Sequence, residues 1–214
     1  NSKMILLFGE MIHRVLSRTR GNTICFSINM TFLLSLDWAA MGTVSTRNEI
    51  LNYPTVGLIT YSDGPRGNGS GIPYFYLTLR DFSAQDLEKD NRATLIMSLA
   101  QSDQCQKKKY DAFDPRCARV ILTGRVTDIT EYKPACEAYF LRHPYLIGHD
   151  FFLARLETES IIIMSGFGGY IHVDPHDYYH PSTKNLMNMV LNIPQERTLT
   201  LSYCDTVPPP PFDY

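Results

Sequence analysis

Three histidines and two aspartates near the carboxyl end of the chain are the first residues whose types and spacing could do chemistry. The group consists of His172, His176 and His180, with Asp174 and Asp177 between them. On one continuous helix, side chains four residues apart share a face and could bind a divalent transition metal. Pro175 interrupts the run, however, and the residues before it are compatible with a strand. We therefore interpret these side chains as solvated or capping groups and expect no metal site.

A second candidate is the glycine- and proline-rich segment from Ser62 to Leu77, which reads SDGPRGNGSGIPYFYL. It lacks the glycine spacing of a dinucleotide-binding turn and the Gly-Lys-Ser/Thr ending of a phosphate-binding loop. Ser70 is not flanked by the glycines of a nucleophile elbow. His149-Asp150 has no paired nucleophile, so a hydrolase triad has no support. The segment instead predicts a long, shaped hairpin loop between two strands, and loops of this kind often carry function.

Alternating and β-branched runs predict a fold made mainly of short strands. The expected strands are 38–46, 55–62, 73–79, 92–100 and 118–129, the last bent at Gly124, followed by 151–156 and 160–167 paired across a Glu-Thr-Glu turn. Expected helices are 4–16, 83–89 with Ser83 as N-cap, 131–142, and a short one starting at Asp174-Pro175. We predict one mainly β (α+β) domain, closed or sandwiched, with a few peripheral helices.

Charge and composition exclude some classes of function. The net charge of −2 gives no electrostatic case for binding nucleic acid. The one basic run, Lys107 to Lys109, is interpreted as part of a solvated loop. No stretch reaches the roughly eighteen consecutive apolar residues of a membrane span.

Cysteines and glycosylation motifs bear on the compartment. Five cysteines cannot all pair within one chain, and no Cys-x-x-Cys motif suggests zinc or redox chemistry. Asn29-Met30-Thr31 and Asn68-Gly69-Ser70 are N-glycosylation motifs, so Asn29 and Asn68 are the candidate glycosylation sites.

Several motifs, in order along the chain, resemble one family. They are DWAAMGTVST at 37–46, the segment at 62–77, ATLIMSLAQ at 93–101, Cys105 with Cys117, FDP at 113–115, LTG at 122–124, RHP at 142–144 and Gly168-Gly169. Together they resemble the CREG family (cellular repressor of early-viral-gene-stimulated genes), which are secreted glycoproteins. The resemblance divides the chain into 1–36, an N-terminal helix with a poorly matching insertion, a CREG-like domain at 37–180, and a flexible tail at 181–214.

The resemblance implies a split β-barrel of the FMN-binding type, similar to pyridoxamine 5'-phosphate oxidases, that forms homodimers. It implies a disulfide between Cys105 and Cys117 and no catalytic residues, no metal and no bound cofactor. In that family, loop residues fill the pocket that a flavin would occupy. The candidate residues for this pocket-blocking or recognition loop are Asp63, Gly64, Pro65, Gly67, Gly69, Gly71 and Pro73.

The implied function is that of a non-enzymatic, secreted or endolysosomal glycoprotein. It would act in growth restraint, differentiation or lysosomal function through protein partners, with a mannose-6-phosphate-type receptor as a suggested partner. The alternative hypothesis is an FMN- or haem-dependent oxidoreductase on the same barrel. Its cofactor phosphate would be bound by Ser45, Thr46, Arg47 and Ser62.

Overall fold

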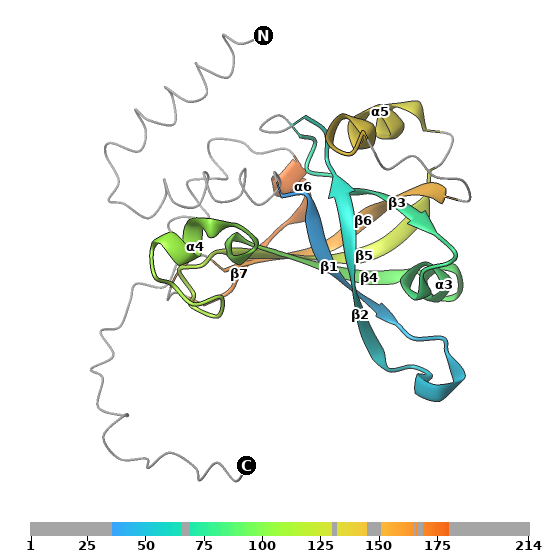
Figure 1. Cartoon of the computed structure of the whole chain (residues 1–214), viewed down its shortest axis with the longest axis horizontal. Coiled ribbons are helices and arrows are strands. Elements are labelled where there is room, and N and C mark those ends of the chain that lie inside the picture. The colour runs from blue at the N-terminus through green and yellow to red at the C-terminus, as the bar shows by residue number, and fades with distance from the viewer. Residues whose placement is uncertain are drawn as a thin grey trace.

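The computed structural model describes residues 36–65, 69–129, 132–144, 151–164, 166 and 169–179. Seven strands form one sheet, with short helices at its margins (Figure 1). In chain order the elements are β1 (Trp38–Val44), η1 (Asn48–Ile50), β2 (Pro54–Ser62), β3 (Tyr74–Thr78), α3 (Phe82–Lys89), β4 (Arg92–Ser98), η2 (Leu99–Gln101), α4 (Asp103–Lys107), β5 (Arg119–Asp128), α5 (Lys133–Arg142), β6 (Phe151–Met164), β7 (Ile171–Val173) and α6 (Pro175–Tyr179).

The sheet closes on itself. Its strand order is β3-β2-β1-β4-β5-β6-β7, and a further pairing of β3 with β6 joins six strands into an antiparallel barrel. The short strand β7 pairs with β6 beyond the end of β3. Closure removes the exposed sheet edges that an open β fold must protect. The mainly β barrel with few helices that was expected from the sequence is therefore confirmed.

The expected hairpin between residues 151 and 167 is wrong. Phe151 to Met164 is one strand of 14 residues, paired with β5 along most of its length. Its Glu-Thr-Glu segment does not form a turn and stays paired with β5. The register shifts by one residue there, since Thr123 lies opposite Ser160 and Gly124 lies opposite Thr158. The extra residue on β6 makes a β-bulge, which bends a strand without ending it.

Gly124 explains why the bulge lies where it does. A Cβ at this position would come 2.0 Å from the carbonyl oxygen of Glu157. Only glycine allows the two backbones to approach so closely. Gly124, where the sequence predicted a bend of its own strand, therefore lies opposite a bulge in β6.

Alternating side chains fill the barrel. Met41, Leu95 and Leu122, on three adjacent strands, are each at most 1% exposed, while their neighbours along the strands face outward. Burial of this apolar surface is the main driving force for closing the barrel. None of the described helices is both long enough and apolar enough to cross a membrane.

Helix boundaries required two corrections. The N-cap of α3 is Asp81, whose carboxylate accepts a hydrogen bond from the Ser83 amide at 2.7 Å, so Ser83 is not the cap. The stretch after residue 101 contains the five-residue helix α4, so Lys107 ends a helix where the sequence predicted a solvated loop. The short helix α6 begins at Pro175 as predicted. Three predicted parts lie outside the described residues: the helix 4–16, the rest of the N-terminal segment up to residue 35, and the tail at 181–214.

Candidate functional site

The loop between β2 and β3 is closed by one residue, Asp63. Its carbonyl oxygen accepts hydrogen bonds from the amide and the hydroxyl of Ser70, at 2.7 Å and 3.0 Å. Its carboxylate accepts a third hydrogen bond, from the Gly71 amide at 3.2 Å. These bonds join the two described ends of the loop, and residues 66–68, which include Gly67 and Asn68, lie outside the described residues. The described part of the loop is therefore shaped, as its composition predicted.

Two glycines of the loop are required by this arrangement. A Cβ on Gly69 would lie 1.9 Å from the Asp63 carboxylate, so only a residue without a side chain fits there. Gly71 has a φ of +78°, in the left-handed region that favours glycine, and its position is crowded by the ring of Tyr178. The Tyr178 hydroxyl donates to the Gly71 carbonyl at 3.3 Å, which connects the loop to α6.

A buried ion pair connects the same loop to α5. The Arg142 guanidinium, at the end of α5, contacts the Asp63 carboxylate, and both side chains are only 2% exposed. Arg142 also donates from Nη1 to the Leu36 carbonyl at 3.3 Å. Burial raises the pKa of Asp63, and the nearby Arg142 charge and the Gly71 amide offset this only in part. A buried pair of this kind costs much more to break than an exposed one.

Three further bonds hold the end of β2 to α5. The Ser62 hydroxyl donates to the Ala138 carbonyl at 2.7 Å, and a His143 ring nitrogen lies 2.9 Å from the Tyr61 carbonyl. The hydroxyls of Thr60 and Tyr139 are 2.7 Å apart. The loop is thus clamped to two helices that follow it by many residues in sequence. The sequence motif at 142–144 marked Arg142 as part of the family pattern, but no local signal predicted its partner.

A second buried carboxylate lies at the other end of β1 and β2. Asp86, on α3, is 0% exposed. One carboxylate oxygen accepts from the Thr46 amide at 2.8 Å and the Thr46 hydroxyl at 3.0 Å. The other accepts from the hydroxyls of Thr43 at 3.2 Å and Thr55 at 3.3 Å. We call this arrangement the Asp86 cage.

The Asp86 cage stabilises the carboxylate through hydrogen bonds, with no ion-pair partner among the described residues. Burial acts to raise the pKa of Asp86, but the hydrogen bonds from Thr46, Thr43 and Thr55 together outweigh it, so the pKa lies below its usual value. Donors that could have bound an anionic ligand are therefore already occupied by a carboxylate of the chain itself.

The four residues predicted to bind a cofactor phosphate are not brought together. Ser45, Thr46 and Arg47 follow β1, beyond the pair Val44–Pro54, whereas Ser62 lies beyond the pair Trp38–Thr60 at the opposite end of the ladder. At about 3.4 Å per residue, these ends are about 20 Å apart.

Each of these residues also has a partner within the chain. Thr46 belongs to the Asp86 cage, and the buried Ser45 hydroxyl accepts from the Arg47 amide at 3.3 Å. The Arg47 guanidinium lies over the Phe82 ring, 4.8 Å from its centre. The phosphate site of the alternative hypothesis is therefore not formed by these residues as a group.

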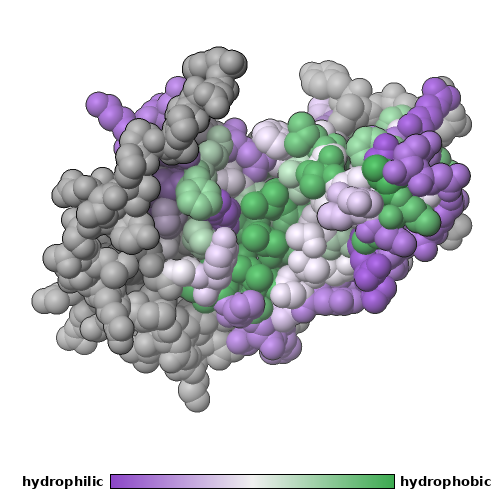
Figure 2. Space-filling view, turned by 90° about the horizontal axis from the view of Figure 1, so that it is seen from below, coloured by the Kyte–Doolittle hydropathy of each residue, from purple (hydrophilic) through white to green (hydrophobic). Residues whose placement is uncertain are grey.

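An apolar row crosses the outside of the barrel. Leu58 on β2 lies opposite Ala40 on β1, which lies opposite Ile96 on β4. The same row continues through Ile121 on β5 to Ile162 on β6. Leu58 is 75% exposed. Figure 2 shows a strip of apolar surface along the middle of the face seen from below.

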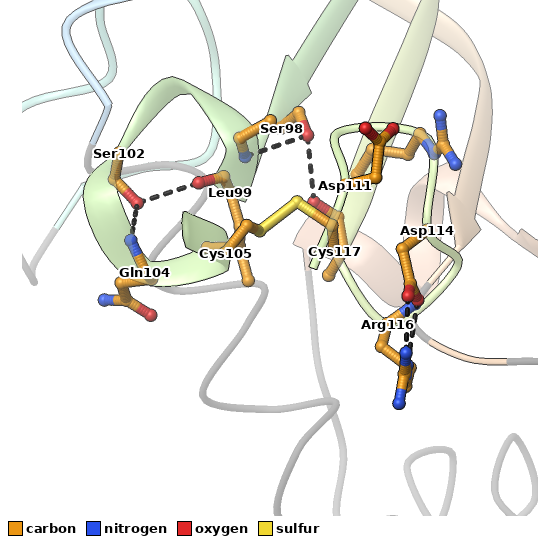
Figure 3. The surroundings of a disulfide bond; sticks show 12 residues. Ser98, Leu99, Ser102, Gln104, Cys105, Asp111, Asp114, Arg116 and Cys117 are labelled. Carbon is orange, nitrogen blue, oxygen red and sulfur yellow. Dashed lines mark hydrogen bonds and ion pairs between the residues drawn. A yellow bond between two sulfur atoms is a disulfide. The ribbon is translucent and has the colours of Figure 1, made fainter. Parts of the chain in front are cut away.

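The disulfide expected between Cys105 and Cys117 is present (Figure 3). It joins α4 to Cys117, two residues before β5, with the two Cα atoms 5.6 Å apart. Ser102 caps α4 by accepting from the Gln104 amide at 3.3 Å. Cys136, on α5, is not in a disulfide.

The histidines and the glycosylation motifs are only partly described. His172 lies on β7 and His176 on α6, so these two do not share a helix face, and His180 is outside the described residues. Within the described part of the chain, no cluster of three metal-binding side chains occurs. Asn29 and Asn68 both lie outside it.

The closed antiparallel barrel, with β6 shared between β3 and β7, defines a split β-barrel. Solved structures agree at low sequence identity. A heme binding protein from Mycobacterium smegmatis superposes with a TM-score of 0.55 at 18% identity, covering 76% of this chain and 62% of that one. The Agrobacterium tumefaciens protein Atu2129, of unknown function, gives 0.53 at 23%, covering 75% of this chain and 62% of that one. These similarities concern the fold alone.

Sequence comparison identifies the family. The family model "CREG, beta-barrel" matches residues 31–180. Protein CREG1 of Homo sapiens is 38% identical over 150 residues, which are 67% of this chain and 68% of that protein. CREG1 of Gallus gallus is 36% identical over 156 residues, covering 69% of this chain and 81% of that one. The chain therefore belongs to the CREG β-barrel family, as its motifs indicated.

Proposed function

We propose that this protein is non-enzymatic and acts through protein partners, as a secreted or endolysosomal CREG-like glycoprotein in growth restraint, differentiation or lysosomal function. The observation that carries the proposal is the Asp86 cage. An oxidoreductase on this barrel would need donors free to bind an anionic cofactor, and the donors around Thr46 bind Asp86 instead. Because these donors are occupied, we propose that the protein acts through its surface and not through a bound cofactor.

The proposed surface has two parts. The loop clamped by Asp63 presents Pro65, Gly69 and Ser70 to solvent, and we assign it the role of recognition loop. Because Arg142 and Tyr178 fix its described ends, little conformational entropy would be lost when a partner binds. A mannose-6-phosphate-type receptor is the proposed partner class, which requires that Asn29 or Asn68 carry a glycan.

The second part is the apolar row through Leu58, Ala40 and Ile96, which we propose as a homodimer face. Contiguous exposed apolar surface on a soluble protein is typical of a protein–protein interface. Ala40 in the row is small, and so is Gly42, two residues further along β1, and small residues allow close approach of a second sheet. The disulfide supports the proposed compartment, since such bonds persist in oxidising surroundings and are rare in the cytosol.

The proposal is tested with protein secreted by an animal cell line from the full-length coding sequence. We expect a colourless protein whose intact mass exceeds the sequence mass by sugar increments that a glycosidase removes. Co-purified flavin or haem absorbance would overturn it in favour of the oxidoreductase alternative. Haem is included because a protein of this fold is named as heme binding.

The dimer is tested separately, by light scattering during size-exclusion chromatography. Leu58→Asp should give a monomer with an unchanged circular dichroism spectrum. Leu79→Asp is the matched control, because Leu79 is also exposed, at 48%, but lies outside the apolar row. A monomeric parent, or a dimer that survives Leu58→Asp, would contradict the proposed face.

A further inference from the structure

The loop closed by the disulfide differs in charge from the rest of the molecule. Between Asp103 and Arg119 there are five basic and three acidic side chains, a net charge of +2, whereas the whole chain carries −2. The basic residues are Lys107, Lys108, Lys109, Arg116 and Arg119. This positive segment includes α4 and ends at β5 (Figure 3).

Its arginines and its lysines are used differently. Arg116 is paired with Asp114 at 2.6 Å and lies over the Tyr110 ring, 4.1 Å from its centre. Arg119 donates to the Phe113 carbonyl at 2.8 Å. Both guanidinium groups, which would give bidentate recognition of a single phosphate, are thus engaged within the chain.

The lysines have fewer interactions within the chain than the two arginines. Lys107 pairs with Asp103 at 2.5 Å in an exposed position, while the exposed Lys108 and Lys109 have no ion-pair partner among the described residues. Lys109 has a φ of 56°, at a helix end where glycine is usually preferred. A lysine is therefore present where conformation alone would favour another residue.

The same loop holds a phenylalanine out in solvent. Phe113 is 80% exposed. Its backbone is fixed on both sides, since its amide donates to the Asp111 carboxylate at 2.8 Å and its carbonyl accepts from Arg119. The Arg119 guanidinium lies 5.6 Å from the ring centre. The backbone that carries this exposed ring is thus fixed by hydrogen bonds.

We propose that this loop docks on the surface of a membrane rich in anionic phospholipid. Lysine ammonium groups act as point charges that suit a diffuse negative surface, and an exposed aromatic ring in the same loop can insert at the headgroup boundary. The disulfide closes the loop that carries both kinds of side chain, which lowers the entropy cost of docking. Binding of this kind is peripheral, reversible and sensitive to salt.

The test is flotation of the purified protein, disulfide intact, with vesicles of phosphatidylcholine alone or with one fifth phosphatidylserine. We expect binding only to the anionic vesicles, weakened by high salt. At about five-fold per lysine, Lys108→Glu with Lys109→Glu should weaken it at least twenty-five-fold. Lys89→Glu with Lys133→Glu is the control, since it changes the net charge equally on α3 and α5 and should retain most of the binding.

A second readout follows the ring. Phe113→Trp should show a blue-shifted emission on anionic vesicles, measured against the parent, whose one tryptophan is Trp38. No binding, equal binding to both vesicle types, or equal loss in the two charge variants would overturn the proposal. Competition by heparin combined with no effect of Phe113→Ser would also overturn it, in favour of a polyanion site.

Discussion

Two buried aspartates lie at opposite ends of the β1–β2 ladder, and the chain stabilises them differently. Asp86 is surrounded by hydroxyl and amide donors from β1, β2 and the turn after β1, and no cation of the described residues forms an ion pair with it. Asp63 has a guanidinium from α5, 79 residues away in sequence. The first holds together one end of the barrel, and the second fixes a loop that lies outside the strands.

The electrostatic consequences are opposite. Hydrogen bonds overcome burial at Asp86 and lower its pKa, whereas burial prevails at Asp63 and raises its pKa. Four hydrogen bonds from three threonines compensate for burial at Asp86. At Asp63 the Arg142 guanidinium and the Gly71 amide compensate for it only in part.

The largest expected effect is that of Asp63→Ala. It removes the carboxyl oxygens that accept from the Gly71 amide and contact the Arg142 guanidinium, and so leaves both donors buried without that acceptor. We expect the free energy of unfolding in urea to fall by about 3–5 kcal/mol. Asp90→Ala, which removes the acidic partner of the exposed Arg92, is the control and should change stability little. Equal stability of the two variants would show that the clamp is not important.

The disulfide provides a covalent standard against which to compare the ion pair. Replacing both Cys105 and Cys117 by serine opens a short loop, and should lower stability by about 3 kcal/mol without reductant. Thermal melting measures this, and a reducing agent should bring the parent to the level of the variant. A parent that melts at the same temperature as the double variant would mean that the bond does not form.

Asp86→Ala should cost less than Asp63→Ala. It leaves the Thr46 amide without its acceptor but strands no charge, so the expected loss is about 1–3 kcal/mol. Urea unfolding of both variants in one buffer gives the order. A larger loss for Asp86→Ala would reverse the comparison and make the cage the more important element.

The smallest effect expected is in the dependence of stability on pH. Asp63, with its raised pKa, contributes stability that is present below pH 3.8 and is lost as pH rises through its folded value. Asp86, with its lowered pKa, contributes stability that is present above pH 3.8 and is lost as pH falls through its folded value. Melting temperatures across this range, parent minus each variant, should therefore slope in opposite directions. Parallel slopes would contradict the two assignments.

Much of the fold follows from local sequence signals, and most of the site does not. Alternation placed β1, β2, β4 and β5 within a few residues of their observed bounds, and Gly124 marked the bulge. The same alternation could not distinguish a bulge from a turn in the Glu-Thr-Glu segment of β6. Whether this segment forms a bulge or a turn depends on its pairing with β5, which the sequence of β6 alone does not reveal.

The two carboxylates illustrate the same limit. Nothing near Asp63 indicates a partner on α5, because an ion pair across 79 residues depends on the closed barrel. Of the threonines around Asp86, only Thr46 was predicted from the sequence to be a donor, and it was assigned to a cofactor phosphate. Only the structure shows that α3 supplies the anion itself.

The most direct test of the central claim is an equilibrium titration of the purified protein with FMN, followed by flavin fluorescence, and with haem, followed by absorbance. We predict no saturable binding of either, because the donors of the Asp86 cage are occupied from within the chain. Stoichiometric, saturable binding of FMN or haem would contradict the account and restore the oxidoreductase hypothesis.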